Sequence, residues 1–103
     1  MKYFTLIVTV LFITSCSPTL HYLGETYQPT IIVDTYYSPE DIKKDFKVIG
    51  QLENGGEIPF NIDRIRTAMI EEAQKRGADA ILFLRSDSFD GRHKIEADLL
   101  RYE

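Results

Sequence analysis

The sequence has few of the residues that usually carry catalysis or metal binding. Among 103 residues there is one cysteine, Cys16, and there are two histidines, His21 and His93. One cysteine excludes an intramolecular disulfide and a soft-metal site built from several thiolates. No serine stands in a nucleophile elbow. We therefore expect a protein that is not an enzyme and that holds no cofactor.

An excess of basic residues is also absent. Lys and Arg total 12 against 16 Asp and Glu, which gives a formal net charge of −4. Removal of residues 1–15 would take away one positive charge, Lys2, and leave −5. Mild acidity argues against nucleic acid, or an anionic bilayer, as an electrostatic partner. We expect no nucleic-acid partner.

The apolar run near the N-terminus is too short to cross a bilayer. Lys2 precedes the largely apolar residues 3–13, whereas a spanning helix needs about 20 such residues. A positive charge followed by a short apolar run is typical of a secretory signal peptide.

A possible lipid-attachment site follows this run. Ile13-Thr14-Ser15-Cys16 resembles the lipobox of bacterial lipoproteins, with Ile and Thr where Leu and Ala or Ser are more usual, as in Bacteroidetes-type sequences. The resemblance implies a signal peptide over 1–15 and lipidation, with fatty acids such as palmitate, at Cys16. An ordinary secretory signal with an incidental cysteine is the alternative.

Residues 16–29 are predicted to be the lipidated cysteine and a tether, because Pro18, Gly24 and Pro29 interrupt them. Ser17, rather than aspartate, follows the cysteine. By resemblance to enterobacterial sorting, this implies a cell-envelope protein in the outer membrane, and the absence of an acidic run implies that it faces the periplasm. His21 is expected to be a solvated residue of the tether.

The stretch 61–84 predicts one long helix and a buried strand. Apolar residues recur at three- and four-residue intervals, with Asn61 as N-cap and Gly77 just past the C-terminal end. Residues 78–84 are apolar on both alternating sets, as in a central strand.

Three further segments are predicted to be strands: residues 30–37, 46–52 and 93–102. In the second, we expect Phe46, Val48, Gly50 and Leu52 to share one face. Asp90-Gly91 indicates a hairpin before the last strand. We therefore predict one α+β domain over 30–103, a small four-stranded sheet in the order β-β-α-β-β with one main helix packed on one face.

The carboxylates near this hairpin are the candidate metal ligands. Hard cations take oxygen ligands, and the stretch 87–98 offers four carboxylates: Asp87, Asp90, Glu96 and Asp98. The stretch lacks the ligand spacing and closing glutamate of a calcium loop. We predict no metal site and keep ligand or metal binding at this hairpin as the alternative.

The segment from Arg76 to Ile81, Arg-Gly-Ala-Asp-Ala-Ile, together with Val48-Ile49-Gly50, resembles the YbjQ-like domains labelled heavy-metal-binding, and more distantly the Rcs stress-sensor lipoproteins. The resemblance implies a small α+β domain that can assemble into a ring. The cysteines of the Rcs lipoproteins, and any thiolate that would support the metal label, are missing.

These observations lead to one functional hypothesis. We expect a membrane-anchored periplasmic lipoprotein that acts as a protein-interaction or self-assembling envelope module, with a homo-oligomer or another envelope protein as partner. Tyr36, Tyr37 and Tyr102 are the candidate interaction residues.

Overall fold

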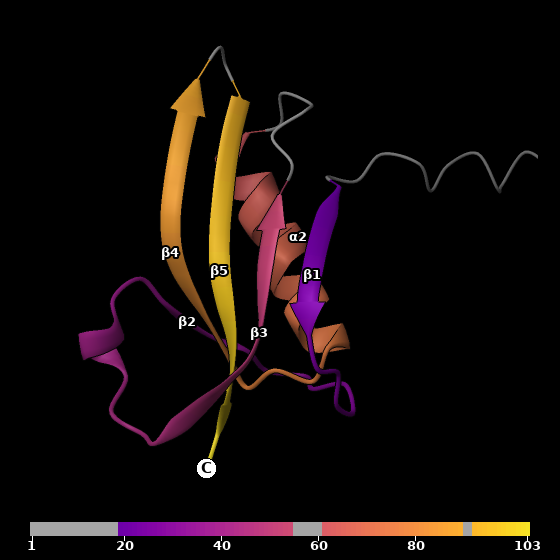
Figure 1. Cartoon of the computed structure of the whole chain (residues 1–103), viewed down its shortest axis with the longest axis vertical. Coiled ribbons are helices and arrows are strands. Elements are labelled where there is room, and N and C mark those ends of the chain that lie inside the picture. The colour runs from indigo at the N-terminus through magenta and orange to yellow at the C-terminus, as the bar shows by residue number, and fades with distance from the viewer. Residues whose placement is uncertain (1–18, 55–60, 90–91) are drawn as a thin grey trace, which may run out of the picture.

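The computed structural model describes residues 19–54, 61–89 and 92–103. In this part of the chain one α-helix lies against a five-stranded mixed sheet (Figure 1). The elements are β1 (Leu20–Gly24), β2 (Asp34–Tyr36), the 3-10 turn η2 (Pro39–Asp41), β3 (Phe46–Asn54), α2 (Ile62–Lys75), β4 (Ala80–Phe89) and β5 (Arg92–Tyr102). The α+β class with one main helix is confirmed. The expectation of four strands is wrong, because the sheet has five.

Helix α2 has the termini that its sequence predicts. The Asn61 side chain accepts a hydrogen bond from the Arg64 backbone N–H at 2.8 Å and so caps the first turn. Gly77, just past the end, has φ 78°, in the left-handed region that favours glycine. The buried stripe consists of Ile65, Met69 and Ala73.

The strand order is β1-β3-β5-β4-β2. Strand β5 lies antiparallel between β3 and β4, so β3 and β4 are parallel to each other and α2 connects them past β5. Strands β4 and β5 form the predicted antiparallel hairpin, although its turn at 90–91 lies outside the described residues. We call the end of the sheet where β1 starts and β4 finishes the hairpin end, and the opposite end the β2 end (Figure 1).

Strand β1 replaces part of the expected tether, over residues 20–24. Leu20 pairs with Asn54 and Gly24 with Gly50, so β1 extends the sheet along β3. Leu20 and Tyr22 pack against the core beneath α2, whereas alternate residues of β1 lie on the other face. The strand forms because it buries apolar surface and pairs with an otherwise open edge of β3. The sheet therefore begins at residue 20 rather than 30.

Strand β2 is shorter than the expected 30–37. Ile31 is 88% exposed. The backbone before β2 bonds to the end of α2: the Thr30 N–H donates to the Gln74 carbonyl at 3.0 Å, and Gln74 Nε2 donates to the Ile31 carbonyl at 2.7 Å. Because the helix end satisfies these groups, the chain joins the sheet only at Asp34.

The expectation that Phe46, Val48, Gly50 and Leu52 share one face is wrong. The pairing of β3 with β5 shifts register between Val48 and Gly50. Ile49 and Leu52 both lie in the core under α2, whereas Phe46 packs on the opposite face. An extra residue in one strand reverses the facing of the residues on either side of it. Strand β4 contains a second such shift.

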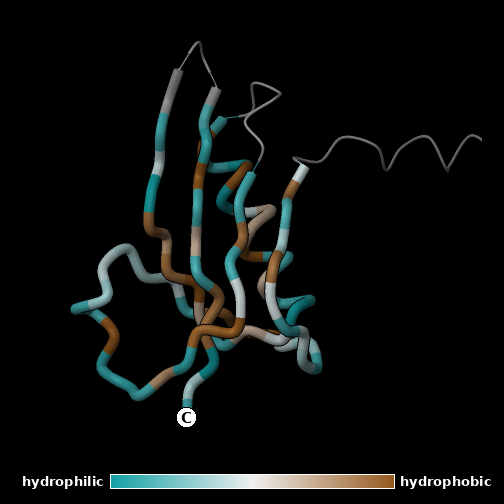
Figure 2. The backbone as a smooth tube through the Cα atoms, viewed as in Figure 1, coloured by the Kyte–Doolittle hydropathy of each residue, from teal (hydrophilic) through white to brown (hydrophobic). Residues whose placement is uncertain are grey.

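The main core lies between α2 and the sheet. Its largest fully buried side chains on this face are Leu52, Ile65, Met69, Ile81, Ile95 and Leu99. Strand β4 is brown in its lower half and teal above, so it changes from apolar to polar toward the hairpin end (Figure 2). On β4 the described side chains beyond Phe83 are therefore exposed, whereas on β5 the core continues as far as Ile95.

Candidate functional site

The face of the sheet without a helix has a covered part and an open part. Directly opposed residues of neighbouring strands point to the same face. The pairing places four residues in one row across β1, β3, β5 and β4: Leu23, Gln51, Asp98 and Leu82. Leu82 is buried, whereas Leu23 is 81% exposed. The segment that buries Leu82 on this face therefore does not extend across the sheet as far as Leu23.

A second, small core fills the covered part. Ala80, Leu82 and Leu100 are its buried members. Four partly buried residues pack around them: Tyr36, Ile42, Phe46 and Tyr102. Ile42 follows η2, so the η2 segment supplies part of the cover on this side of the sheet (Figure 1).

The open part lies over β1, β3 and the neighbouring stretch of β5. Val48 pairs with the buried Leu100 and shares its face, yet it is 54% exposed. The row beyond Leu23 and Gln51 on this face, toward the hairpin end, contains His21, which pairs with Glu53, and Glu96, which also pairs with Glu53. We call this surface the open face and define it by His21, Leu23, Val48, Gln51, Glu53, Glu96 and Asp98. Two exposed aliphatic side chains thus lie among carboxylates.

A shallow depression occupies the β1 side of the open face. Its volume is about 140 Å³, and it is lined by His21, Tyr22, Leu23, Gln51 and Glu53. Pockets for drug-sized ligands usually measure about 300–1,000 Å³. The depression is too small for such a ligand, and this surface suits a macromolecule better.

Asp98 is the carboxylate of the open face with a shifted pKa. Burial raises the pKa of Asp98 above its ordinary value of 3.8. The side chain lies between Gln51 and the buried Leu82 in the row across the sheet. Burial disfavours a charged carboxylate, so a partner that brings a hydrogen-bond donor or a positive charge to this position would stabilise the charge.

Two of the three candidate tyrosines form a hydrogen-bonded group at the β2 end. The Tyr36 and Tyr102 hydroxyl oxygens lie 2.9 Å apart, and the Tyr102 hydroxyl donates to Asp34 Oδ2 at 2.5 Å. Burial, followed by these two hydrogen bonds, raises the pKa of Tyr102. The Lys44 ammonium lies 4.6 Å from the centroid of the Tyr102 ring. These contacts join β2 to β5.

The third tyrosine lies apart from this group. Tyr37 is 60% exposed, and its ring stacks on Phe83 with centroids 5.5 Å apart. The Arg66 guanidinium of α2 lies 5.3 Å from the centroid of the Tyr37 ring. Because Phe83 belongs to the core under α2, Tyr37 packs toward the helix side of the sheet. The three tyrosines therefore do not form one surface patch.

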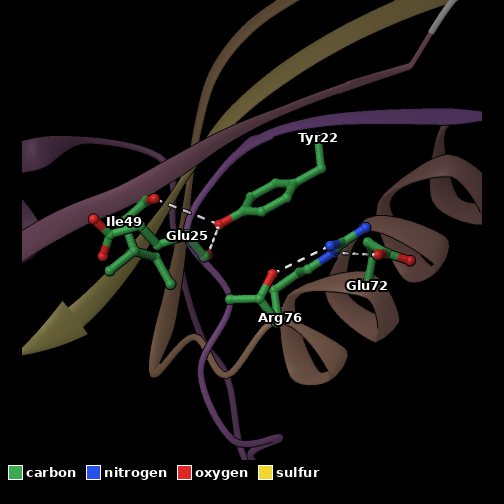
Figure 3. Close-up of polar contacts among 6 residues, drawn as sticks. Tyr22, Glu25, Ile49, Glu72 and Arg76 are labelled. Atoms are coloured by element: carbon green, nitrogen blue, oxygen red, sulfur yellow. Dashed lines mark hydrogen bonds and ion pairs between the residues drawn. The ribbon is translucent and has the colours of Figure 1, made fainter.

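Strand β1 is also fastened to the end of α2. Figure 3 shows the Tyr22 ring beside Arg76, whose guanidinium carbon lies 4.6 Å from the ring centroid. The Tyr22 hydroxyl donates to the carbonyl of Glu25, and Arg76 Nε forms an ion pair with Glu72 at 2.7 Å. Burial raises the pKa of Tyr22, while the positive charge of Arg76 opposes the shift. These contacts hold β1 to the rest of the domain.

The carboxylates of the hairpin are dispersed among cations. Asp87 forms an ion pair with Arg85 at 3.1 Å and stands opposite Lys94. Glu96 stands opposite Arg85, and Asp98 lies further down β5. Asp90 lies outside the described residues. Within the ranges that the structure describes, no three His, Cys, Asp or Glu residues gather as they would around a metal ion. Metal binding at the hairpin stays the alternative hypothesis.

The predicted lipid-attachment site, Cys16, lies outside the described residues. Among the residues that are described, no helix is both long and apolar enough to cross a bilayer.

Comparison with protein-family models, with curated proteins and with solved structures finds no match to this chain. The resemblance to YbjQ-like domains and to the Rcs lipoproteins therefore stays a prediction.

The β1 side of the open face was not predicted from the sequence. The signal that could have found it is the alternation in Leu20-His21-Tyr22-Leu23, in which Leu20 and Tyr22 are partly buried and the other two are exposed. Four residues are a short pattern, and the nearby Gly24 and Pro29 indicated a loop instead.

Proposed function

We propose that the protein is a non-enzymatic envelope lipoprotein, anchored in the outer membrane through lipid on Cys16 and facing the periplasm, that binds a protein partner on its open face. The signal-like N-terminus and the lipobox resemblance support the anchor. Two acyl chains are needed for stable anchoring, and lipoprotein modification supplies them. The open face supports the binding role.

One observation carries the binding proposal: Leu23 and Val48 are exposed on a sheet face that the η2 segment covers only in part. Aliphatic side chains surrounded by polar ones are the arrangement of a protein interface, with an apolar centre and a polar rim. Three of the polar residues are acidic: Glu53, Glu96 and Asp98.

The charge of the open face favours a different protein over a second copy of this chain. In a two-fold symmetric dimer the same patch meets itself. Glu53, Glu96 and Asp98 of one copy would then lie near the same carboxylates of the other, and Arg85, which stands opposite Glu96, would offset only part of this repulsion. A partner with basic residues around an apolar centre would complement the face.

Site-specific photo-crosslinking in living cells tests this proposal. A photoreactive residue replaces Leu23 or Val48, and in control proteins it replaces Glu71 or Lys75, which are exposed on α2. We expect one adduct shared by the Leu23 and Val48 variants, missing from both controls and weakened by Glu53→Lys. An adduct of twice the mass of the chain would show self-assembly instead. The same adducts from all four positions would contradict a specific site.

Light scattering on the form that starts at Ser17, with and without divalent metal, tests the alternative function. Association that requires metal would favour the hairpin carboxylates as a ligand site. A metal-independent monomer is what we expect.

A further inference from the structure

The start of β1 limits how far the folded domain can stand from its lipid. Leu20 already lies in the sheet, paired with Asn54, and only three residues, 17–19, separate it from Cys16, which makes four Cα–Cα steps. An extended chain spans at most ~3.6 Å per residue, so Leu20 lies within ~14 Å of the Cys16 Cα. The contacts of Tyr22 with the end of α2 make the separation of β1 costly, so the tether cannot lengthen at the expense of this strand.

The hairpin extends past the level of Leu20 toward the same side. Leu20 pairs with Asn54. Asn54 lies one residue beyond the Glu53–Glu96 pair, so Leu20 is level with Ile95 of β5 and with Ser86 of β4. Strands β4 and β5 continue for three more residue pairs, up to Phe89 with Arg92. At ~3.4 Å per residue, the hairpin extends ~10 Å further. This distance is close to the full reach of the tether.

We infer that, in the lipid-anchored protein, the hairpin end of the sheet lies against the phospholipid headgroups, while the β2 end, with η2 and the C-terminus, points into the aqueous space. This inference rests on the lipid anchor of the proposed function. The open face then stands across the membrane surface, reachable by a partner from the side.

The charge distribution fits this orientation. Residues 85–94 contain three Lys or Arg and two Asp, for a net charge of +1, whereas the rest of the chain from Cys16 onward carries −6. Anionic lipids attract basic segments near the bilayer surface and repel acidic ones. The hairpin itself is not repelled by an anionic surface, and the short tether brings it there together with two carboxylates at the same end of the sheet, Glu53 of β3 and Asp63 in the first turn of α2.

Fluorescence quenching on vesicles tests the orientation. The lipidated full chain is placed in phosphatidylethanolamine–phosphatidylglycerol vesicles with nitroxide-labelled headgroups, and a fluorophore is attached at Lys94→Cys or, as the matched control, at Lys43→Cys. Because the Cys16 thiol is acylated, the introduced cysteine is the single free thiol. We expect several-fold stronger quenching at position 94. Equal quenching at the two positions, or stronger quenching at 43, would overturn the inference.

A lengthened tether provides the second test. Ten Gly and Ser residues inserted between Pro18 and Thr19 give a flexible span of about 20 Å. We expect the quenching at position 94 to fall toward the value at 43 while the protein still floats with the vesicles. Unchanged quenching would show that the hairpin binds lipid without help from the tether. Failure to float would refute the anchor itself, so the two proposals fail in different ways.

Discussion

Tyr102, in the last strand, donates a hydrogen bond from its hydroxyl to Oδ2 of Asp34, the first residue of β2. The same hydroxyl lies 2.9 Å from that of Tyr36. Strand β2 has three residues and pairs with β4 alone. The tyrosine thus links β2 to the central strand β5 independently of the β2–β4 ladder.

Tyr102→Phe is expected to lower the free energy of unfolding by about 1–3 kcal/mol, because Asp34 loses a donor in a hydrogen bond to a charged group. Chemical denaturation measures the change. Tyr37→Phe is the control, since the stacking on Phe83 does not need the hydroxyl, and its cost should stay within about 0.5 kcal/mol. Equal costs for the two variants would show that the Asp34 bond contributes nothing.

Gly50 gives Tyr22 the space that β1 needs. A Cβ on Gly50 would lie within 2.5 Å of the Tyr22 ring. Gly50→Ala should therefore displace the ring and destabilise the domain by about 1–3 kcal/mol. In Gly50→Ala/Tyr22→Ala the clash is gone, so the double variant should lose less than the sum of the single losses. Additive losses would contradict this packing.

The pH dependence of stability tests the surroundings of Asp98. Because burial raises its pKa in the folded state, the folded protein binds this proton more tightly than the unfolded chain does. The free energy of unfolding therefore falls as pH rises through the range just above 3.8, the ordinary value. Asp98→Asn removes that loss.

We expect Asp98→Asn to be more stable than the natural protein at pH 7, with the difference shrinking as the pH is lowered to about 3, below the ordinary pKa of 3.8, where the carboxyl is largely protonated in both states. Denaturant midpoints across this range measure the effect. Asp87→Asn controls for the change of net charge. A stability difference that does not vary with pH would contradict the prediction.

The core under α2 predicts a contrast between two isoleucines. Ile65 is completely buried, so Ile65→Ala should cost about 2–5 kcal/mol through lost burial and the cavity that remains. Ile31 is 88% exposed, and Ile31→Ala should change stability by less than about 0.5 kcal/mol. Thermal or chemical unfolding compares them. A large loss at Ile31 would indicate that this residue is covered in solution.

The parts of the fold with strong local signals could be predicted from the sequence. Asn61 caps α2, Gly77 follows its end, and the strand predicted over residues 93–102 matches β5. Each of these depends on neighbours within about one helical turn or one strand. The core under α2 was therefore largely predictable.

The remaining features depend on distant partners. Strand β1 forms because it pairs with the otherwise unpaired edge of β3. Ile31 stays outside the sheet because its backbone carbonyl accepts a hydrogen bond from Gln74 at the end of α2. The register shift before Gly50 reverses the facing of Phe46 relative to Leu52. The open face consists largely of residues affected by these features, so the sequence alone did not predict it and indicated three tyrosines instead.

Acylation and membrane fractionation of the full chain test the lipid anchor on Cys16. Cells that express the natural sequence or Cys16→Ser are fed an alkyne-labelled palmitate, and their membranes are separated from the soluble fraction. We predict that the natural protein incorporates label and sediments with the outer membrane, while Cys16→Ser stays unlabelled and leaves that membrane. An unlabelled natural protein, or a Cys16→Ser protein that distributes in the same way, would contradict it.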